Sequence, residues 1–472
     1  MQTINITPAM RRMYEKLSVA NIKFLETINQ NPEFLERKNY RELVGWRHPS
    51  SHVKLQPWPV FINQSTRREF AEASSKILDL VKSLPWRIFD FNPQRISEYF
   101  HLPLEHVRYF LFGTSREHIE GLLGRGDFML ASSGLKCIEF NATSTLGGWQ
   151  LPIWESLYRQ NPLISGFLNT QGLKITNQNL IGLLFNHLIN LTYRLYPDEE
   201  EINLAVAIYD PVFVEALSTH DQYLNHLYML FMRQLKQQSQ DMPKRGKIIL
   251  CMLNQLKRVD DHLYYEDKKI HTIIDYAAGD IPLDILALAK MGKVLLYNGP
   301  VSFIVSDKLN LALLSELEES AIFTDDERQT IKKHIPWTRK MTPGQTTYHG
   351  EKIELEGFVR GNQEQLVLKP AGGHGGEGVL IGNHIPGDQW QKTVTEAIHQ
   401  RRWLVQERID SLPFLFQEGE NNYAEFDTVL GMFVYGPTYG GAWVRIMPQK
   451  QSKGVINTQQ GAETPIVFEV ED

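Results

Sequence analysis

Residues 366–381 read LVLKPAGGHGGEGVLI and carry the strongest structural signal in the chain. An apolar run ends in Lys369, a glycine-rich loop follows, and a second β-prone run begins at Val379. This pattern predicts a strand, a flexible loop and a second strand, with a cation at the end of the first strand. Glycine permits a backbone with positive φ close to a ligand, and successive exposed N–H groups form an anion-binding concavity. We expect a phosphate-binding loop, with an ordinary glycine-rich hairpin as the alternative, and its glycines are Gly372, Gly373, Gly375, Gly376 and Gly378.

The order of these features excludes three better-known nucleotide loops. A Walker A loop has Gly-Lys-Ser/Thr at the start of a helix, whereas Lys369 precedes the glycines. A Rossmann fingerprint needs a helix after its glycines, but a β-prone run follows here. A protein-kinase loop also lies between two strands, but its lysine lies on the next strand. Lysine, then loop, then strand is similar to the arrangement in ATP-grasp enzymes.

The composition is that of an ordinary globular protein. The chain has 472 residues, of which 42% are hydrophobic, and this length suggests about three structural units. The net charge of −6 gives no basic field, so we expect no nucleic acid partner. No uninterrupted apolar run reaches the roughly 18 residues of a membrane span, and the first residues lack the apolar core of a signal peptide. With two cysteines the composition suits a reducing cytosol, so we expect a cytoplasmic protein without a membrane partner, and a homodimer stays open.

Four segments with different patterning predict a mixed fold, α+β with an α/β part. Residues 1–120 form a mostly helical N-terminal region, and residues 121–200 combine a β-prone hairpin with helices. In residues 201–310, apolar runs that predict strands alternate with stretches that predict helices. Residues 311–472 begin with a charged stretch that predicts helix and are mainly β-prone after it.

The third of these segments predicts a small parallel α/β unit. Its apolar runs lie at 203–210, 247–252 and 293–298, and a long helical stretch at 212–237 separates the first two. Strands that alternate with helices are typical of a parallel sheet.

A candidate metal site lies on two short β-prone runs that residues 132–134 would join as a hairpin. Glu139 and Asn141 are two positions apart on the second run, so their side chains point to the same face. Arg125 and Asp127 share a face of the first run, and pairing of the runs could bring all four side chains together. Carboxylate and amide oxygens suit Mg²⁺, and arginine is a bidentate donor to phosphate or carboxylate. The alternative is a polar hairpin face with surface charges.

Two further patterns are candidates for nucleotide contacts. The strand-like run at 403–409 contains Gln406 and Glu407, which a connector between two lobes could present to an adenine edge. The basic pair Arg339-Lys340 follows a helix and a proline. Each of these has an ordinary strand end or surface charge as the alternative.

Residues 433–445 predict a hairpin with turns at Gly436-Pro437 and Gly440-Gly441. Arg445 lies beyond the second turn and is a candidate catalytic cation, with a surface position as the alternative. The 15 histidines show no metal-ligand spacing, and no serine-nucleophile elbow is present.

In the order and spacing of these motifs, the chain resembles the ATP-grasp ligases. It is most similar to the circularly permuted group that includes the synthetase domain of glutathionylspermidine synthase. In that group the Arg-x-Asp and Glu-x-Asn residues precede the nucleotide lysine, whereas in ordinary ATP-grasp enzymes the metal ligands follow it. Here Arg125-x-Asp127 and Glu139-x-Asn141 precede Lys369. The first hundred residues match no motif of the group, and no amidase domain is recognisable.

The resemblance implies an ATP-grasp fold with a pre-ATP-grasp α/β domain at 201–310 and a nucleotide-binding region at 311–472. It also implies roles for single residues. The implied Mg²⁺ ligands are Asp127, Glu139 and Asn141. The expected catalytic residues are Arg125, Lys369 and Arg445. The implied ATP contacts are Lys340 (or less favoured Arg339), Lys369, the loop glycines, Gln406 and Glu407.

The function that the resemblance implies is ATP-dependent carbon–nitrogen ligation, with ATP and Mg²⁺. A substrate carboxylate would take the γ-phosphate as an acylphosphate, and an amine would then displace phosphate to form an amide. Two alternatives remain: an ATP-grasp phosphotransferase, and a non-catalytic nucleotide-binding scaffold. The acid and amine could each be an amino acid or a peptide, and the amine could be a polyamine, because no motif identifies either.

Overall fold

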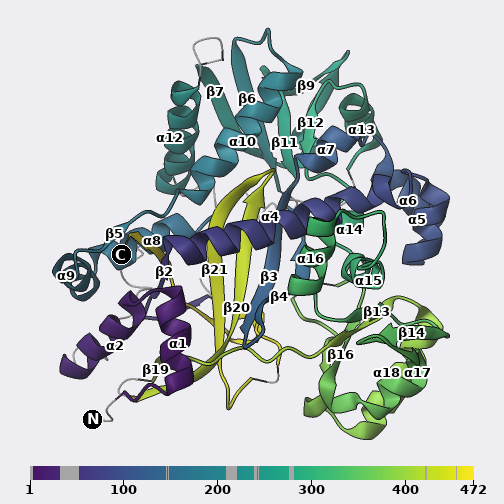
Figure 1. Ribbon diagram of the computed structural model, residues 1–472. Coiled ribbons are helices and arrows are strands. Elements are labelled where there is room, and N and C mark those ends of the chain that lie inside the picture. The colour runs from purple at the N-terminus through teal and green to yellow at the C-terminus, as the bar shows by residue number, and fades with distance from the viewer. Residues whose placement is uncertain are drawn as a thin grey trace.

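The computed structural model describes residues 4–31, 53–144, 146, 148–208, 221–238, 242, 244–275, 281–373, 375–419, 422–452 and 454–471. Residues 212–220 of the predicted helix and His374 of the predicted loop lie outside the described residues. The fold is a mixed α/β arrangement of helices around several sheets (Figure 1).

A seven-stranded sheet lies at the centre of the molecule (Figure 1). Its strand order is β1-β22-β21-β20-β3-β4, with β19 paired to β20. Apart from the parallel pair β1 and β22, neighbouring strands are antiparallel. The strands are β1 (Lys54–Leu55), β3 (Leu123–Ala131), β4 (Gly134–Asn141), β19 (Phe414–Glu418), β20 (Asn422–Tyr435), β21 (Thr438–Pro448) and β22 (Glu463–Thr464).

The predicted hairpin of the metal motif is confirmed, and the second predicted hairpin is corrected at one turn. β3 and β4 pair from Arg125↔Asn141 to Ala131↔Gly134. β20 and β21 turn once, at Gly436-Pro437, between the paired residues Tyr435 and Thr438. The second predicted turn, at Gly440-Gly441, is wrong because these glycines lie within β21. The strand pairing is irregular at this point, because Phe433 pairs with Gly441 and Val434 pairs with Tyr439, which leaves Gly440 as an extra residue. Glycines within a strand often mark such a bulge.

One long helix, α4 (Gln64–Arg87), covers one face of this sheet (Figure 1). It contacts β3, β20 and β21 through buried apolar side chains such as Phe70, Ile77 and Val81. The Asn63 side chain accepts a hydrogen bond from the backbone N–H of Thr66 and so caps the helix. In the described part of residues 1–120, the other helices are α1 (Pro8–Leu17), α2 (Ala20–Gln30), α5 (Pro93–Phe100), α6 (Leu104–Leu111) and α7 (Arg116–Glu120). Because α4 occupies one face, only the opposite face of the sheet is available for a site.

A four-stranded parallel sheet confirms the predicted α/β unit. Its order is β12-β11-β6-β7, and all pairs are parallel. The sequence did not predict β11, a short run next to the polar three-stranded meander of β8, β9 and β10. The elements are β6 (Glu201–Ala207), α12 (Asp221–Gln237), β7 (Arg245–Cys251), β8 (Lys257–Val259), β9 (His262–Tyr265), β10 (Lys268–Ile270), β11 (Thr272–Asp275), α13 (Leu283–Lys290) and β12 (Leu295–Tyr297). With α10 (Leu180–Leu195), α12 packs on one face and α13 on the other.

A smaller antiparallel sheet carries the glycine-rich loop. Its order is β13-β18-β16-β17, and the pair Val367↔Ile381 confirms the predicted strand, loop and strand. Two helices and a short hairpin complete this part of the chain around buried Trp390. Its elements are β13 (Thr338–Lys340), β14 (Gln345–Tyr348), β15 (Glu351–Glu354), α17 (Leu355–Gly361), β16 (Leu366–Pro370), β17 (Leu380–Ile381), α18 (Gly387–Gln400) and β18 (Trp403–Glu407).

The remaining elements join these parts. A three-stranded sheet of order β2-β23-β5 ties the N-terminal region to the end of the chain. In the described part of the chain, no helix combines the length and apolar character that a membrane crossing requires. The remaining elements are β2 (Val60–Asn63), α8 (Leu151–Gln160), α9 (Pro162–Thr170), β5 (Lys174–Ile175), α14 (Ser302–Val305), α15 (Leu309–Glu316), α16 (Asp325–His334) and β23 (Val467–Glu471).

Candidate functional site

A cavity of about 530 Å³ lies between the central sheet and the glycine-loop sheet. Its volume is in the range of small-molecule sites in proteins. The central sheet contributes residues from β3, β4, β20 and β21, and the smaller sheet contributes residues from β16, β17 and β18. Of the predicted site residues, those that line it are Arg125, Asp127, Glu139, Asn141, Lys369, Gly375, Gly376, Gln406, Glu407 and Arg445.

The pairing of β3 with β4 brings the predicted metal motif onto one face. Asp127 lies opposite Glu139, and Arg125 lies opposite Asn141. Directly opposed residues of an antiparallel pair point to the same side, so all four face the cavity. A bulge follows, because Phe128 pairs with Cys137 and leaves Ile138 as the extra residue.

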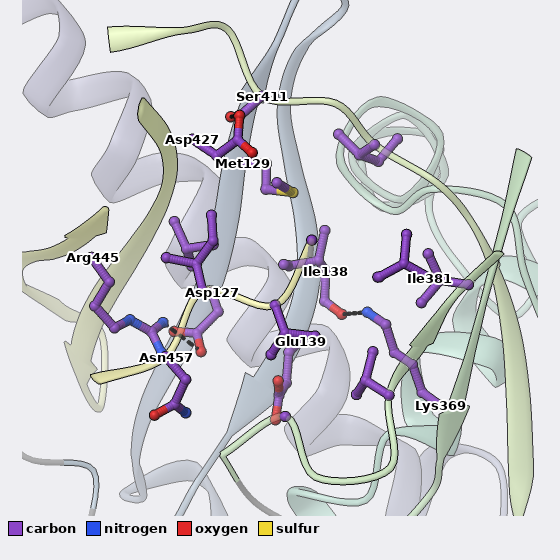
Figure 2. A pocket seen from close by; sticks show the side chains of 18 of the residues that line it. Asp127, Met129, Ile138, Glu139, Lys369, Ile381, Ser411, Asp427, Arg445 and Asn457 are labelled. Carbon is purple, nitrogen blue, oxygen red and sulfur yellow. Dashed lines mark hydrogen bonds and ion pairs between the residues drawn. The ribbon is translucent and has the colours of Figure 1, made fainter. Parts of the chain in front are cut away.

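Two arginines hold the carboxylate of Asp127. Nε and Nη2 of Arg125 donate to its oxygens at 2.8 and 3.1 Å, and Nη2 of Arg445 lies 2.8 Å from Oδ2. Burial alone would raise the pKa of Asp127, but the two guanidinium groups outweigh it and hold this pKa at about 2. Figure 2 shows Arg445 and Asp127 pointing toward one another at one side of the cavity.

Gly431 on β20 makes room for this cluster. β20 lies between β3 and β21, and Gly431 pairs with Asp127 on one side and with Trp443 on the other. A Cβ at this position would lie 2.9 Å from Cδ of Arg125 and 3.2 Å from Oδ1 of Asp127. The absence of a side chain therefore lets charges from two strands meet across a third.

Arg445 is a buried donor with spare capacity. Its Nε and Nη2 have no hydrogen-bond partner of good geometry among the described residues, although Nη2 lies beside Asp127. The centres of the Arg445 and Arg125 guanidiniums lie 5.7 and 5.5 Å from the ring of Trp443, so one indole supports both cations. An anion in the cavity would satisfy the free donors.

Lys369 reaches the cavity from the opposite sheet. Its ammonium donates to the backbone oxygen of Ile138, at 2.8 Å, and to Oε1 of Gln406, at 2.7 Å. The bulge exposes this carbonyl to the lysine, and Figure 2 shows the contact beside Glu139. Burial lowers the pKa of Lys369 to about 8, against the opposing influence of Glu139. Lys369 is thus mainly a cation near pH 7 and close to its titration point.

The glycine loop closes one side of the cavity. Gly375 and Gly376 are part of its lining, and Val455 lies across from them. Gly376 has φ +76°, and a Cβ there would lie 2.4 Å from Cγ1 of Val455. The described loop therefore touches the segment after β21 at a distance that only glycine allows. Gly372, Gly373 and Gly378 are not among the lining residues.

Lys308, which was not among the predicted site residues, links the glycine loop to the metal motif. Its ammonium donates to the backbone oxygen of Gly373 at 2.7 Å and lies 3.4 Å from Oε1 of Glu139. Its backbone N–H donates to the oxygen of Ala371, at the start of the loop. The neighbouring Asp307 is buried and ion-paired with Arg402 at 2.6 Å.

Apolar side chains form the middle of the cavity. Met129 and Val429 come from the central sheet, and Val367 and Ile381 come from the smaller sheet. Figure 2 shows Met129 and Ile138 facing Ile381 across this space. Apolar walls with a few polar groups are typical of small-molecule sites.

The structure does not bring Lys340 or Arg339 to this cavity. The Lys340 ammonium donates to the backbone oxygen of Tyr99 and lies 4.9 Å from the centre of that ring. Arg339 bonds to Ser315 and Thr346 and stacks beside Trp337. The role of Lys340 as a phosphate cation therefore stays a prediction without a contact here.

The lining also contains residues to which the sequence assigned no role in the site. Asp427 and Ser411 lie at the end opposite Lys369, and Asn457 lies near Arg445 (Figure 2). Asp427 accepts a hydrogen bond from Gln449 at 2.9 Å. Asp427, Val429 and Gly431 are spaced two residues apart on β20 and therefore lie on the same face of the strand. This spacing is the sequence signal that could have identified Asp427.

The donor set suits a metal ion only in part. Glu139 and Asn141 offer oxygens on the cavity face, as Mg²⁺ prefers. Both oxygens of Asp127 are engaged by guanidiniums, and the described residues contain no group of three His, Cys, Asp or Glu side chains arranged for a metal. Of the three predicted ligands, Glu139 and Asn141 are therefore the two whose oxygens no guanidinium engages among the described residues.

Comparison with known proteins identifies a solved structure with a similar fold. No protein-family model and no curated protein matches the chain. Among solved structures, a glutathione synthetase-like effector from Globodera pallida, in its apo form, matches over 88% of this chain and 90% of its own. The TM-score is 0.57 and the sequence identity 13%.

The chain shares this ligase-like fold. A candidate gamma-glutamylcysteine synthetase from Methylobacillus flagellatus also matches, with 84% of this chain and 88% of that chain covered, a TM-score of 0.42 and 11% identity. At these identities the first likeness establishes the fold and leaves the activity to the residues of the cavity.

Proposed function

We propose that this chain is an ATP-dependent carboxylate–amine ligase of the ATP-grasp type, which forms an amide and releases ADP and phosphate. One observation carries the proposal. Lys369 and the glycine loop face Glu139, Asn141 and the paired arginines across a single cavity. The glutathione synthetase-like fold supports the same class of reaction.

The nucleotide would lie with its base in the apolar middle of the cavity and its phosphates toward Lys369. Met129 and Ile381 would flank the base, and Glu407 belongs to the same lining. The Gln406 side chain is buried and hydrogen-bonded to Lys369 and Thr338. In the proposal it therefore orients the lysine, and neighbouring residues contact the adenine edge. Gly375 and Gly376 would cover the phosphates.

Glu139 and Asn141 would hold Mg²⁺, and Asp127 would join them once an anionic substrate draws both Arg125 and Arg445 away. The metal would supply neutralisation of phosphate charge. The ammonium of Lys308, 3.4 Å from Glu139, would then keep the loop in register with the metal ligands.

The chain's own residues would act mainly by position and charge. Arg125 and Arg445 would orient the substrate carboxylate for attack on the γ-phosphate, which forms an acylphosphate and ADP. Lys369 would stabilise the charge that moves to the leaving group. The amine would attack the acyl carbon, form the C–N bond and expel phosphate. The loop at Gly376 would exclude water, which would otherwise hydrolyse the acylphosphate.

The order of the motifs supports the permuted arrangement. β3 and β4, which carry the proposed metal ligands, precede β16 and its loop in the chain. We propose that residues 201–310 are the pre-ATP-grasp unit, that residues 311–472 contribute the nucleotide-binding part, and that the enzyme is cytoplasmic.

A screen of pooled acids and amines tests this function. ADP release should require both an acid and an amine, and mass spectrometry should find an amide. Glu139→Gln and Lys369→Met should abolish turnover, whereas Glu364→Gln and Lys352→Met, at exposed positions outside the cavity, should retain it. A phosphoester product would instead identify a phosphotransferase. Mg·ATP binding by calorimetry without turnover of any acid and amine would favour a non-catalytic nucleotide-binding scaffold.

A further inference from the structure

A second cavity, of about 870 Å³, lies on another part of the molecule. It forms where α6 and α7 meet the end of α10 and the segment between α13 and β12. It shares no lining residue with the first cavity. In Figure 1, α7 and α13 lie in the upper part of the molecule, whereas β16 and its loop lie at the lower right.

The walls of this second cavity are largely apolar. Leu111, Leu191 and Leu295 contribute to them from three different elements. The side chains of Phe112 and Leu195 are 38% and 44% exposed, so a molecule bound in the cavity could contact both. A contiguous open apolar surface of this kind marks a binding site more often than a scattered exposed residue does.

Three cations surround these walls without a carboxylate partner. Arg108, Arg194 and Lys290 line the cavity, and among the described residues none of the three has an ion pair or a hydrogen bond with an acidic side chain. The Lys290 ammonium lies 4.8 Å from the ring centre of Phe112, which places a charge directly on the apolar wall. The single lining carboxylate, Glu117, leaves the cavity cationic in a chain whose net charge is −6.

Two arginines near this cavity have acidic partners within the protein. Arg116 on α7 pairs with Glu120 at 2.8 Å and packs over the ring of Trp86. Arg95 on α5 pairs with Asp90 at 2.6 Å. The three cations that line the cavity are exposed and have no such partner among the described residues, so an external anion can reach them.

His118 adds a polar group to the wall. Its Nε2 is buried and has no hydrogen bond of good geometry among the described residues, and its ring lies close to the backbone of Leu296.

We propose that the second cavity binds a small amphipathic organic anion, with an aromatic or aliphatic body and a carboxylate or sulfonate group. The body lies against Leu111, Phe112 and Leu195, and the acidic group faces Arg194 and Lys290. This site is independent of the proposed ligase reaction, because the two cavities share no residue.

Fluorescence titration with two related probes tests the proposal. 8-Anilinonaphthalene-1-sulfonate has an aromatic body and an anionic group, and N-phenyl-1-naphthylamine has nearly the same body without the charge. The double variant Arg194→Gln/Lys290→Gln should weaken sulfonate binding by about fivefold or more at low salt, and the loss should shrink at high salt. Binding of the neutral probe should change less than about twofold.

A matched control removes the same net charge elsewhere. Lys257→Gln/Lys352→Gln alters two exposed lysines outside both cavities and should leave both probes unchanged. Any sulfonate binding in the first cavity is common to all three proteins and cancels in the comparison. Equal sulfonate affinity in the three proteins, or an equal loss for both probes, would overturn the proposal.

Discussion

Arg445 on β21 and Asp127 on β3 form a buried ion pair of 2.8 Å across the intervening strand β20. Arg125 shares the same carboxylate, so one negative charge balances two positive ones. The cluster is compact only because Gly431 on β20 has no side chain. The excess positive charge of this three-residue cluster is what the acidic group of a substrate would meet.

Asp127→Asn tests the charge balance. The amide would leave two buried guanidiniums without a counter-ion, so the free energy of unfolding should fall by on the order of 3 kcal/mol. Urea denaturation measures this loss. Asp410→Asn, at an exposed aspartate of the same cavity, should cost less than about 1 kcal/mol. Equal stability of the two variants would contradict the account.

Gly431→Ala tests whether the Arg125–Asp127 cluster needs the space that glycine leaves on β20. The added methyl group would lie 2.9 Å from Arg125 and 3.2 Å from Asp127, so we expect a loss of about 1–3 kcal/mol in unfolding free energy. Gly166→Ala is the control, because Gly166 lies in α9 with open space around it and should gain up to about 1 kcal/mol. A Gly431→Ala protein as stable as the wild type would show that the cluster does not need this gap.

Gly376→Ala tests the closed glycine loop. The Cβ would lie 2.4 Å from Val455, so the loop should no longer reach that segment, and nucleotide-dependent turnover should fall about tenfold or more. Gly419→Ala imposes a similar backbone strain, at φ +71°, with no atom within 4 Å of the new Cβ. If both variants lost the same turnover, backbone strain alone would explain the effect.

Lys308→Met and Lys340→Met separate two candidate lysines. Lys308 links Gly373 to Glu139, so its loss should weaken Mg·ATP binding roughly tenfold while AMP binding changes little. Lys340 contacts Tyr99 outside the cavity, so its variant should bind ATP nearly as the wild type does. Isothermal titration calorimetry measures both, and the reverse ranking would restore Lys340 as the phosphate cation.

The pKa of Lys369 predicts a pH dependence. The protonated ammonium binds phosphate, and its pKa of about 8 means that the ligand-free protein loses this charge as the pH rises. ATP affinity should be constant below pH 7 and fall by up to tenfold per unit above pH 8. Lys369→Arg keeps its charge in this range and should give a flat profile. A flat wild-type profile between pH 7 and 9 would contradict the assignment.

Local patterns predicted much of the site. Period-two spacing placed Glu139 and Asn141 on one face, and the strand, loop and strand around Lys369 follow from an apolar run, glycines and a second apolar run. Both features depend on neighbours in sequence, where side-chain direction is fixed by the backbone.

The contacts that the sequence did not reveal join distant segments. The pairing of Arg445 with Asp127 depends on the register of three strands, and Lys308 acts from the residue before α15, a position that the sequence did not assign to the site. The glycines at 440 and 441 suggested a turn, but tertiary pairing keeps them within β21. The Lys340 side chain points toward Tyr99 and away from the cavity, a direction that the strand pattern alone did not predict.

The central claim is that a carboxylate is activated by phosphate transfer in the first cavity. The most direct measurement uses an acid substrate whose carboxylate is labelled with oxygen-18, together with ATP and the amine, and follows the label in the released phosphate. The account predicts one labelled oxygen transferred to phosphate for each amide formed. Unlabelled phosphate formed along with the amide, or label retained on a phosphorylated product, would contradict it.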